Sequence, residues 1–227
     1  MASDTIPTVS SGASSYRQKS ASYFEGARYD FVQRLPRDAS ASVLEVGCGS
    51  GATGALAFAH GRAGRYVGVE LFEGAASEAR KVLSDVVVGD VESIEFPWQP
   101  AEFDALILSE VLEHLLDPWT TLSRLARHVR PGGLVLASSP NVSNWRVLRE
   151  LLAGRFPQAD QGVFDRTHMR WFTPATFAEM FERAGFTVDR VAPVTPFAER
   201  TALLSRLTGG RLDHLFMVQI SLEGHRR

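Results

Sequence analysis

The fold of this chain is decided at one stretch of the sequence, Val43-Leu44-Glu45-Val46-Gly47-Cys48-Gly49-Ser50-Gly51. A short apolar run ends at the first of three alternating glycines, which predicts a strand followed by a sharp turn. Small residues over 51–60, closed by Gly61, predict a helix after the turn. Ligands of open α/β sheets bind outside the carboxyl ends of the strands, where glycines let the backbone approach the ligand closely. The stretch therefore predicts a ligand-binding turn between a strand and a helix.

The same alternation of strands and helices continues along the chain. Apolar runs predict further strands over residues 66–69, 86–88, 103–108, 134–137, 186–191 and 215–222. Apolar residues at helical spacing predict helices over 21–35, 73–83, 118–129, 144–153, 174–184 and 198–208. Pro131-Gly132-Gly133 predicts a turn that leads into the strand at 134–137. This order predicts a doubly wound α/β fold, in which helices cover both faces of a parallel sheet.

Composition limits the class of protein. The 227 residues carry 24 basic and 26 acidic side chains, a net charge of −2, and the single Cys48 excludes a disulfide framework or a cysteine-rich metal cluster. We expect residues 1–15, rich in Ser, Thr, Gly and Pro, to form a flexible leader, and residues 16–227 to form one domain. The near-neutral charge argues against a nucleic-acid partner. With no apolar run near the roughly 18 residues of a membrane span and no signal-peptide pattern, we expect a cytoplasmic protein.

Three carboxylates follow the predicted strands at the edge of the sheet where a ligand would bind. Glu45 precedes the turn, Glu70 ends the second strand, and Asp90 follows the third. A carboxylate after the second strand suits a ribose diol, because it accepts hydrogen bonds from both hydroxyls. Asp90 is placed to accept from an adenine amino group, and Glu45 lies where a cationic group could sit. No Lys or Arg occurs over 45–61 to neutralise a pyrophosphate, so the pattern indicates an adenosine that carries positive charge.

With these features the chain resembles the class I S-adenosylmethionine-dependent methyltransferases. The resemblance covers about residues 40–195 and rests on five motifs in order, at residues 43–51, 67–70, 89–92, 103–107 and 130–133. It implies a Rossmann-like, seven-stranded, mostly parallel sheet whose antiparallel last strand is inserted between its neighbours. It also implies S-adenosyl-L-methionine as the cofactor. The residues that it implies for the cofactor, from the methionine end to the strand that closes the site, are Glu45, Gly47, Gly49, Gly51, Glu70, Leu71, Asp90, Val91, Ser109 and Glu110.

A second interpretation of the turn stays open. Gly49-Ser50-Gly51-Ala52-Thr53-Gly54 also satisfies G-x-G-x-x-G, the fingerprint of dinucleotide binding. An NAD(P)-dependent oxidoreductase would use Glu70 in much the same way. It would explain neither Glu45 nor Asp90, so the methyltransferase is the favoured interpretation.

An acidic and histidine-containing segment follows the buried strand at 103–108. If it is helical, Glu110 shares a face with Glu113 and His114. With His168 from the later sequence, these groups predict either a divalent metal site or a general base, with His114 or His168 as the catalytic residue. The pattern resembles small-RNA 3′-terminal 2′-O-methyltransferases and ubiquinone-pathway O-methyltransferases. That resemblance implies Glu110, Glu113, His114 and His168 as metal ligands.

Residues 139–172 break the rhythm, and we expect them to form an insertion that covers the substrate side. The insertion interleaves arginines with aromatic residues, a combination that suits a planar or sugar-like acceptor bearing phosphate or carboxylate. The predicted substrate residues are Asn141, Asp165, Arg166 and Arg170. The segment also resembles methyltransferases that accompany glycosyltransferases. We therefore expect methyl transfer to a small-molecule or glycan acceptor, at a hydroxyl oxygen, with 2′-O-methylation of RNA as the alternative.

Overall fold

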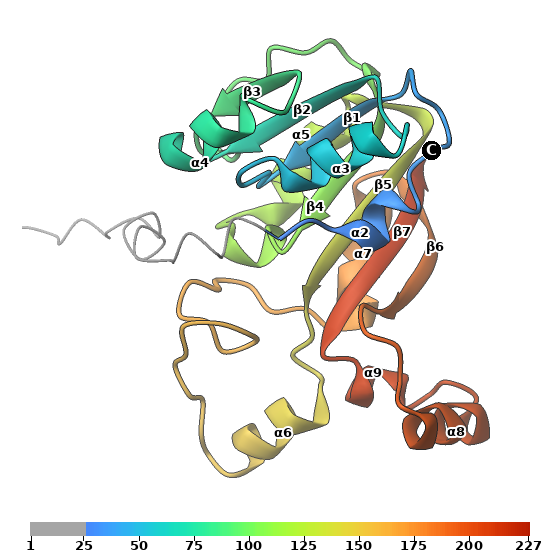
Figure 1. The fold of residues 1–227 in the computed structure, drawn as a ribbon. Helices are drawn as coiled ribbons and strands as arrows, with labels where there is room; N and C mark the ends of the chain where they lie inside the picture. The colour runs from blue at the N-terminus through green and yellow to red at the C-terminus, as the bar shows by residue number, and fades with distance from the viewer. Residues whose placement is uncertain (1–25) are drawn as a thin grey trace, which may run out of the picture.

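A computed structural model describes residues 26–227 and places a single twisted sheet at the centre of the molecule (Figure 1). The seven strands stand in the order β3-β2-β1-β4-β5-β7-β6. Their bounds are β1 Ser42–Val46, β2 Arg65–Glu70, β3 Asp85–Val88, β4 Phe103–Ser109, β5 Val129–Pro140, β6 Phe186–Pro193 and β7 Gln219–Arg226. Strands β1 to β5 pair in parallel, whereas β7 is antiparallel to both of its neighbours, β5 and β6. The predicted fold class is confirmed, including the last strand inserted between its neighbours.

Helices cover both faces of the sheet. On one face lie α2 Tyr29–Val32, α3 Ala52–Ala59 and α4 Glu73–Ala79, whose buried residues share a core cluster with the sheet. On the other face, α5 Pro118–Ala126 and α7 Pro174–Arg183 belong to a second core cluster. Strand β4 runs between these two clusters with its central residues buried, as its continuous apolar run predicts. Of the helix expected over 21–35, the structure describes residues 26–35, where only Tyr29–Val32 is an α-helix. The expected leader 1–15 lies outside the described residues.

Two strands depart from their predicted bounds by more than two residues, β5 and β7. The expected turn at Pro131-Gly132-Gly133 lies inside β5, where a register shift opposite Phe103 and Ala105 accommodates it. The last strand, expected over 215–222, begins only at Gln219, and residues 215 and 216 belong to helix α9 Asp213–Phe216. Apolar runs as short as this one fit a helix or a strand equally well. The end of α9 is held by Asn141, whose amide donates to the carbonyls of His214 and Met217.

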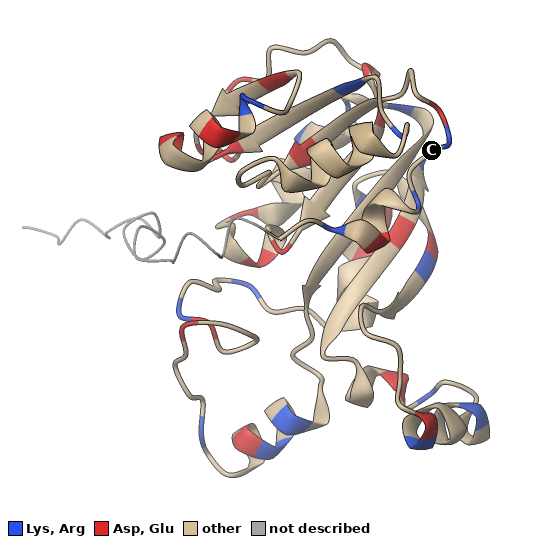
Figure 2. Ribbon diagram, in the orientation of Figure 1, with Lys and Arg blue, Asp and Glu red and all other residues tan. Residues whose placement is uncertain are grey.

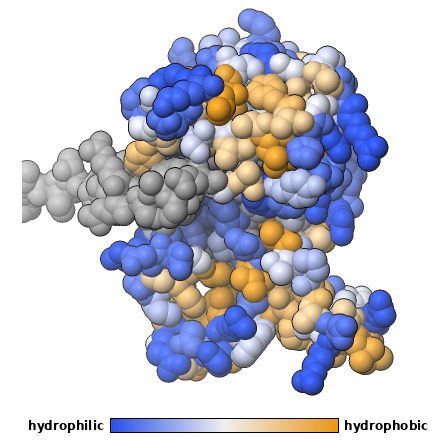
Figure 3. Space-filling model, in the orientation of Figure 1, coloured by the Kyte–Doolittle hydropathy of each residue, from blue (hydrophilic) through white to orange (hydrophobic). Residues whose placement is uncertain are grey.

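After the end of β5 and before the start of β7, the chain forms the lower part of the molecule in Figure 1. Helix α6 Trp145–Leu152 opens the insertion, and the loop after it returns to the sheet at Phe172. Helix α8 Glu199–Thr208 and α9 lie near it. Figure 3 shows apolar side chains at the surface of this lower part. Within residues 26–227 no helix combines the length and the hydropathy that crossing a bilayer requires.

Candidate active site

The glycine-rich turn between β1 and α3 has the predicted conformation. Gly47, Gly49 and Gly51 have φ values of 72°, 54° and 84°, in the left-handed region that favours glycine. A Cβ atom on Gly47 would lie 2.7 Å from the Val111 side chain, so there a larger residue is excluded by space as well. The turn thus needs glycine for its backbone and brings main-chain N–H groups to the carboxyl end of β1.

Glu70 at the end of β2 is tied to this turn. Its carboxylate accepts hydrogen bonds from the N–H groups of Gly49 at 2.9 Å and Phe72 at 3.0 Å. Burial raises the pKa of Glu70, and these backbone N–H groups offset part of the rise. Leu71 beside it is 40% exposed. Glu70 therefore bridges the turn and the loop after β2, at the place where a ribose diol is predicted.

Glu45 lies under the turn rather than at its surface. Its carboxylate is 3% exposed and accepts a 2.9 Å hydrogen bond from the Tyr66 hydroxyl. Burial raises its pKa to about 7, although hydrogen bonds from Tyr66 and Thr53 act in the opposite direction. Glu45 contributes to the electrostatics of the turn and to its internal support. That it touches the methionine moiety of a cofactor stays a prediction.

The third carboxylate follows the neighbouring strand. Asp90 is exposed after β3, and its Oδ1 accepts a 2.9 Å hydrogen bond from the N–H of Glu92. Val91 is buried in the core beside it. Because β3, β2 and β1 are adjacent and parallel, all three carboxylates end at the same edge of the sheet, as predicted.

Sequence analysis missed Arg28, which enters this edge from the N-terminal side of α2. Its guanidinium donates to the hydroxyls of Ser109 at 2.5 Å and Ser138 at 2.6 Å, and its backbone N–H donates to Thr53 at 3.2 Å. It also forms an ion pair with Asp30. A cation therefore stands between the ends of β4 and β5 and the start of α3. Its partners Thr53, Ser109 and Ser138 lie far away along the chain, so no local pattern marks its place at this edge.

The segment after β4 is not a continuous helix. Glu110 has φ 55°, which ends the strand and separates it from the short 3₁₀ turn Leu112–His114. Glu110 Oε2 accepts a 3.2 Å hydrogen bond from Gln219, while Oε1 is buried without a partner among the described residues. Burial raises the pKa of Glu110. The prediction that Glu110, Glu113 and His114 share a helical face is wrong, because the left-handed residue changes the direction of the chain.

Glu113, His114 and His168 meet in a compact group. One ligand atom from each lies within 4.8 Å of the others, and the two imidazole rings are 4.6 Å apart. Both Glu113 oxygens are buried and make no hydrogen bond of good geometry within residues 26–227. Burial and the nearby Glu110 carboxylate raise the pKa of Glu113 well above its usual range. Glu110, predicted as a fourth metal ligand, does not belong to this group.

Backbone carbonyls orient both histidines. Nδ1 of His114 lies 3.2 Å from the Thr167 carbonyl, and Nδ1 of His168 lies 3.2 Å from the Val163 carbonyl. Because a carbonyl only accepts, each neutral ring carries its proton on Nδ1 and its lone pair on Nε2. The Thr167 hydroxyl donates to Asp165 at 2.8 Å and so can only accept from His114. This arrangement is typical of histidines that bind a metal or take up a proton at Nε2.

Known proteins share this architecture. A sequence model of the methyltransferase domain family matches residues 16–191. The chain belongs to the class I S-adenosylmethionine-dependent methyltransferases. It is 32% identical over 166 residues to a ubiquinone biosynthesis O-methyltransferase from Aromatoleum aromaticum, a match that covers 70% of this chain and 69% of the relative.

Other matches are more distant or shorter. Over 130 residues the methyltransferase is 32% identical to a trans-aconitate 2-methyltransferase from an Azoarcus species, which covers 55% of this chain and 50% of that relative. An S-adenosylmethionine-dependent methyltransferase structure from Mesorhizobium loti superposes with a TM-score of 0.63 at 17% identity, covering 89% of this chain and all of that one. This last match shows the fold alone. The oxidoreductase alternative is wrong, because the family is that of the methyltransferases.

The predicted substrate residues of the methyltransferase differ in what they do. Asn141 is fully buried, its amide donates to His214 and Met217, and its oxygen accepts from Ser143. Asn141 therefore fixes the start of the insertion, and both its amide nitrogen and its oxygen are hydrogen-bonded within the protein. Asp165 is buried too and bonds Thr167.

The two arginines predicted for the substrate also have internal partners. Arg166 forms an ion pair with Asp160, and Arg170 donates to the carbonyls of Met169 and Leu116. Figure 2 shows acidic and basic residues interspersed along the insertion. Contact of Arg166 and Arg170 with the acceptor stays a prediction.

Proposed function

We propose that this methyltransferase moves the sulfonium methyl of S-adenosyl-L-methionine to a hydroxyl oxygen of a small-molecule or glycan acceptor. The group formed by Glu113, His114 and His168 carries the proposal, because an alcohol or phenol reacts faster once its proton is held by a base or its charge is stabilised. Glu113 and His114 of this group follow β4, next to the edge where the cofactor is expected, and His168 joins them from the insertion. The name of one relative, an O-methyltransferase, supports an oxygen acceptor.

The cofactor is assigned to the turn and its three carboxylates. In this proposal Gly47, Gly49 and Gly51 hold the methionine moiety above Glu45, Glu70 binds the ribose diol, Asp90 and Val91 bind the adenine, and Ser109 and Glu110 close the site. Arg28 suits the methionine carboxylate, since it is the cation placed beside Ser109 and Ser138. The cofactor supplies the reactive methyl group, and the protein aligns it with the acceptor oxygen.

The donor set also fits a divalent cation. The buried carboxylate of Glu113, which makes no hydrogen bond of good geometry among the described residues, and two histidines whose Nδ1 atoms face backbone carbonyls are ligands that such ions accept. Glu113, His114 and His168 would hold the ion, which, when bound, lowers the pKa of an acceptor hydroxyl. Without it, Nε2 of His114 or His168 takes the proton of the hydroxyl, and the carbonyls at Nδ1 stabilise the resulting imidazolium.

The proposal is tested by methyl transfer from tritiated S-adenosyl-L-methionine to a panel of phenols, hydroxy acids and sugars. His168→Asn and His114→Asn should each lower turnover at least tenfold, whereas His60→Asn, an exposed histidine at the end of α3, should not. A chelator should abolish the activity and Mn²⁺ restore it if the ion is required. Unchanged turnover in both site variants would contradict the proposed role of the group.

The remaining finer assignments stay predictions. The cytoplasmic location, the lid role of residues 139–172 and the lack of a nucleic-acid partner rest on sequence patterns alone. Competition by RNA that disappears with added salt would indicate a nucleic-acid acceptor instead.

A further inference from the structure

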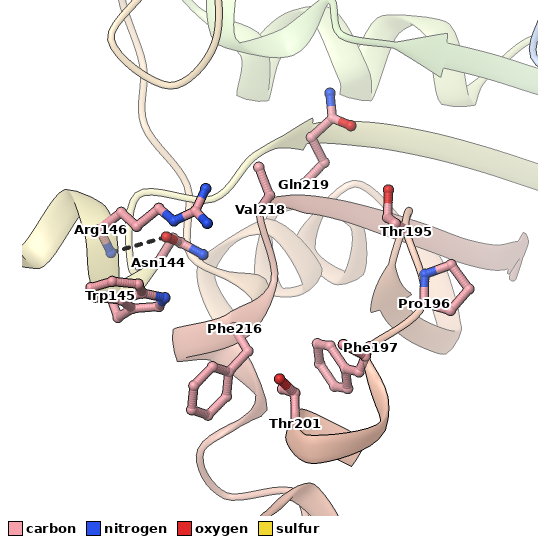
Figure 4. Close-up of a pocket in the computed structure, with 11 residues that line it drawn as sticks. Asn144, Trp145, Arg146, Thr195, Pro196, Phe197, Thr201, Phe216, Val218 and Gln219 are labelled. Atoms are coloured by element: carbon pink, nitrogen blue, oxygen red, sulfur yellow. Dashed lines mark hydrogen bonds between the residues drawn. The ribbon is translucent and has the colours of Figure 1, made fainter.

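A cavity lies at the lower end of the sheet, between α6, α8, α9 and the start of β7 (Figure 4). Its volume is about 220 Å³. Trp145 of α6, Phe197 before α8 and Phe216 of α9 contribute aromatic rings to its wall. Trp145 is one of the aromatic residues expected to face the acceptor from the insertion, whereas nothing in the sequence marks Phe197 or Phe216, because only the fold brings the three elements together.

Arg146 supplies the charge of this cavity. Figure 4 shows its side chain extending from α6 toward Val218. Among the described residues no carboxylate forms an ion pair with Arg146, and its guanidinium lies 5.8 Å from the Trp145 ring. Arg149 on the same helix differs, since it pairs with Glu150 at 3.3 Å and does not line the cavity. A cation in an aromatic wall without an anion beside it is typical of a site that receives its anion from a ligand.

One residue, Gln219, links the cavity to the polar segment after β4. Gln219 lines the cavity and donates its side-chain amide to Glu110 Oε2. Glu110 in turn lies close enough to Glu113 for the two carboxylates to repel. Its Oε1 is buried and makes no hydrogen bond of good geometry among the described residues. A molecule seated in the cavity would therefore present its inner end to the polar groups after β4.

Size and lining narrow the class of ligand. A cavity of about 150 Å³ holds benzene, so this one takes a single substituted ring or an apolar body of similar volume. A longer chain or a sugar attached to that body would extend into solvent. The aromatic wall favours the flat faces of such a body over a fully hydroxylated sugar ring.

We propose that this cavity binds the acceptor, that the aromatic wall holds a ring-sized apolar body, and that Arg146 binds a carboxylate or phosphate attached to it. The inference rests on the proposed function and deepens it by naming the acceptor class, an anionic molecule with one ring-sized apolar part. It moves the substrate site away from the interior contacts of Asn141 and Asp165. Arg146 is a specificity-determining residue in this account, and Gln219 is a positioning residue.

Binding of simple probes tests this inference directly. Phenylacetate and phenyl phosphate carry the ring and the anion, and phenylacetamide is the neutral match for the first. Their affinities for the full chain are measured by NMR line broadening of the probe. Both anions should bind at least tenfold more tightly than the amide, and Arg146→Gln should remove that preference. Arg149→Gln should keep it. The better of the two anions identifies carboxylate or phosphate as the group recognised.

The inference is overturned by equal affinity for phenylacetate and phenylacetamide, or by a preference for the anion that survives Arg146→Gln. Phe216→Ala, which removes part of the wall, should weaken all three probes alike, and unchanged binding would also contradict it. The proposed function is tested separately by thermal stabilisation with S-adenosylhomocysteine. Probe binding without that stabilisation would refute the proposed function, whereas stabilisation without probe selectivity would refute only the acceptor site.

Discussion

The buried carboxylate under the glycine-rich turn makes a pH-dependent contribution to stability that is large enough to measure. Glu45 has its pKa raised from 4.5 to about 7 in the folded protein, so the folded state holds a proton that the unfolded state has already lost between these values. Stability is therefore full below pH 4.5 and falls as the pH rises toward 7. Each unit of difference between the folded and unfolded pKa values is worth about 1.4 kcal/mol. The free energy of unfolding should therefore be lower by about 3 kcal/mol above pH 7 than below pH 4.5.

Glu45→Gln removes this titration while keeping an oxygen that accepts from the Tyr66 hydroxyl. Urea unfolding followed by circular dichroism, at pH 5 and pH 8, gives the free energies of unfolding. Between these two pH values the original protein should lose about 2–3 kcal/mol relative to the variant. Glu179→Gln, an exposed carboxylate on α7, is the matched control and should leave the pH dependence unchanged. Parallel pH profiles for the original protein and Glu45→Gln would refute the reasoning.

Three further predictions concern contacts that the fold creates. Asn141→Ala removes a buried amide with bonds at both ends, and thermal unfolding should show a loss of about 2–4 kcal/mol; a change under 0.5 kcal/mol would argue against its structural role. Thr167→Val breaks the link between Asp165 and His114 and should lower kcat about tenfold or more with little change in the KM for the cofactor, whereas an unchanged kcat would show that the link does not orient the ring. Gly47→Ala forces a Cβ against Val111 at a positive φ, so calorimetry should detect at least tenfold weaker binding of S-adenosylhomocysteine; equal affinity would mean that the turn does not bind the cofactor.

Local patterns were enough to predict the sheet and the glycine-rich turn at the edge where the cofactor is expected. The turn at Gly47 to Gly51 follows from glycine's access to positive φ, and β4 follows from an uninterrupted apolar run, because each signal lies within a few neighbouring residues. The positions of Glu70 and Asp90 then follow from the strands that they end.

Contacts between distant segments were beyond the reach of those patterns. Arg28 donates a hydrogen bond to Ser138, which is 110 residues away along the chain. Gln219 donates one to Glu110, which is 109 residues away. The spacing of Glu110, Glu113 and His114 suits one face of a helix, and nothing in the residue type of Glu110 signals the left-handed backbone that interrupts it. Asn141 is predicted as a substrate residue because a polar residue at a strand end suits a ligand as well as the protein's own carbonyls. Only the fold shows that its amide donates to the carbonyls of His214 and Met217.

The central claim is that an adenosine bearing positive charge binds where the glycine-rich turn and three carboxylates meet. A crystal structure of the protein with S-adenosylhomocysteine tests it most directly. We predict the ribose hydroxyls on Glu70, the adenine beside Asp90 and Val91, and the amino-acid end over Gly47 near Arg28. A nucleoside bound elsewhere, or one at this edge with Glu70 still bonded only to Gly49 and Phe72, would contradict the account.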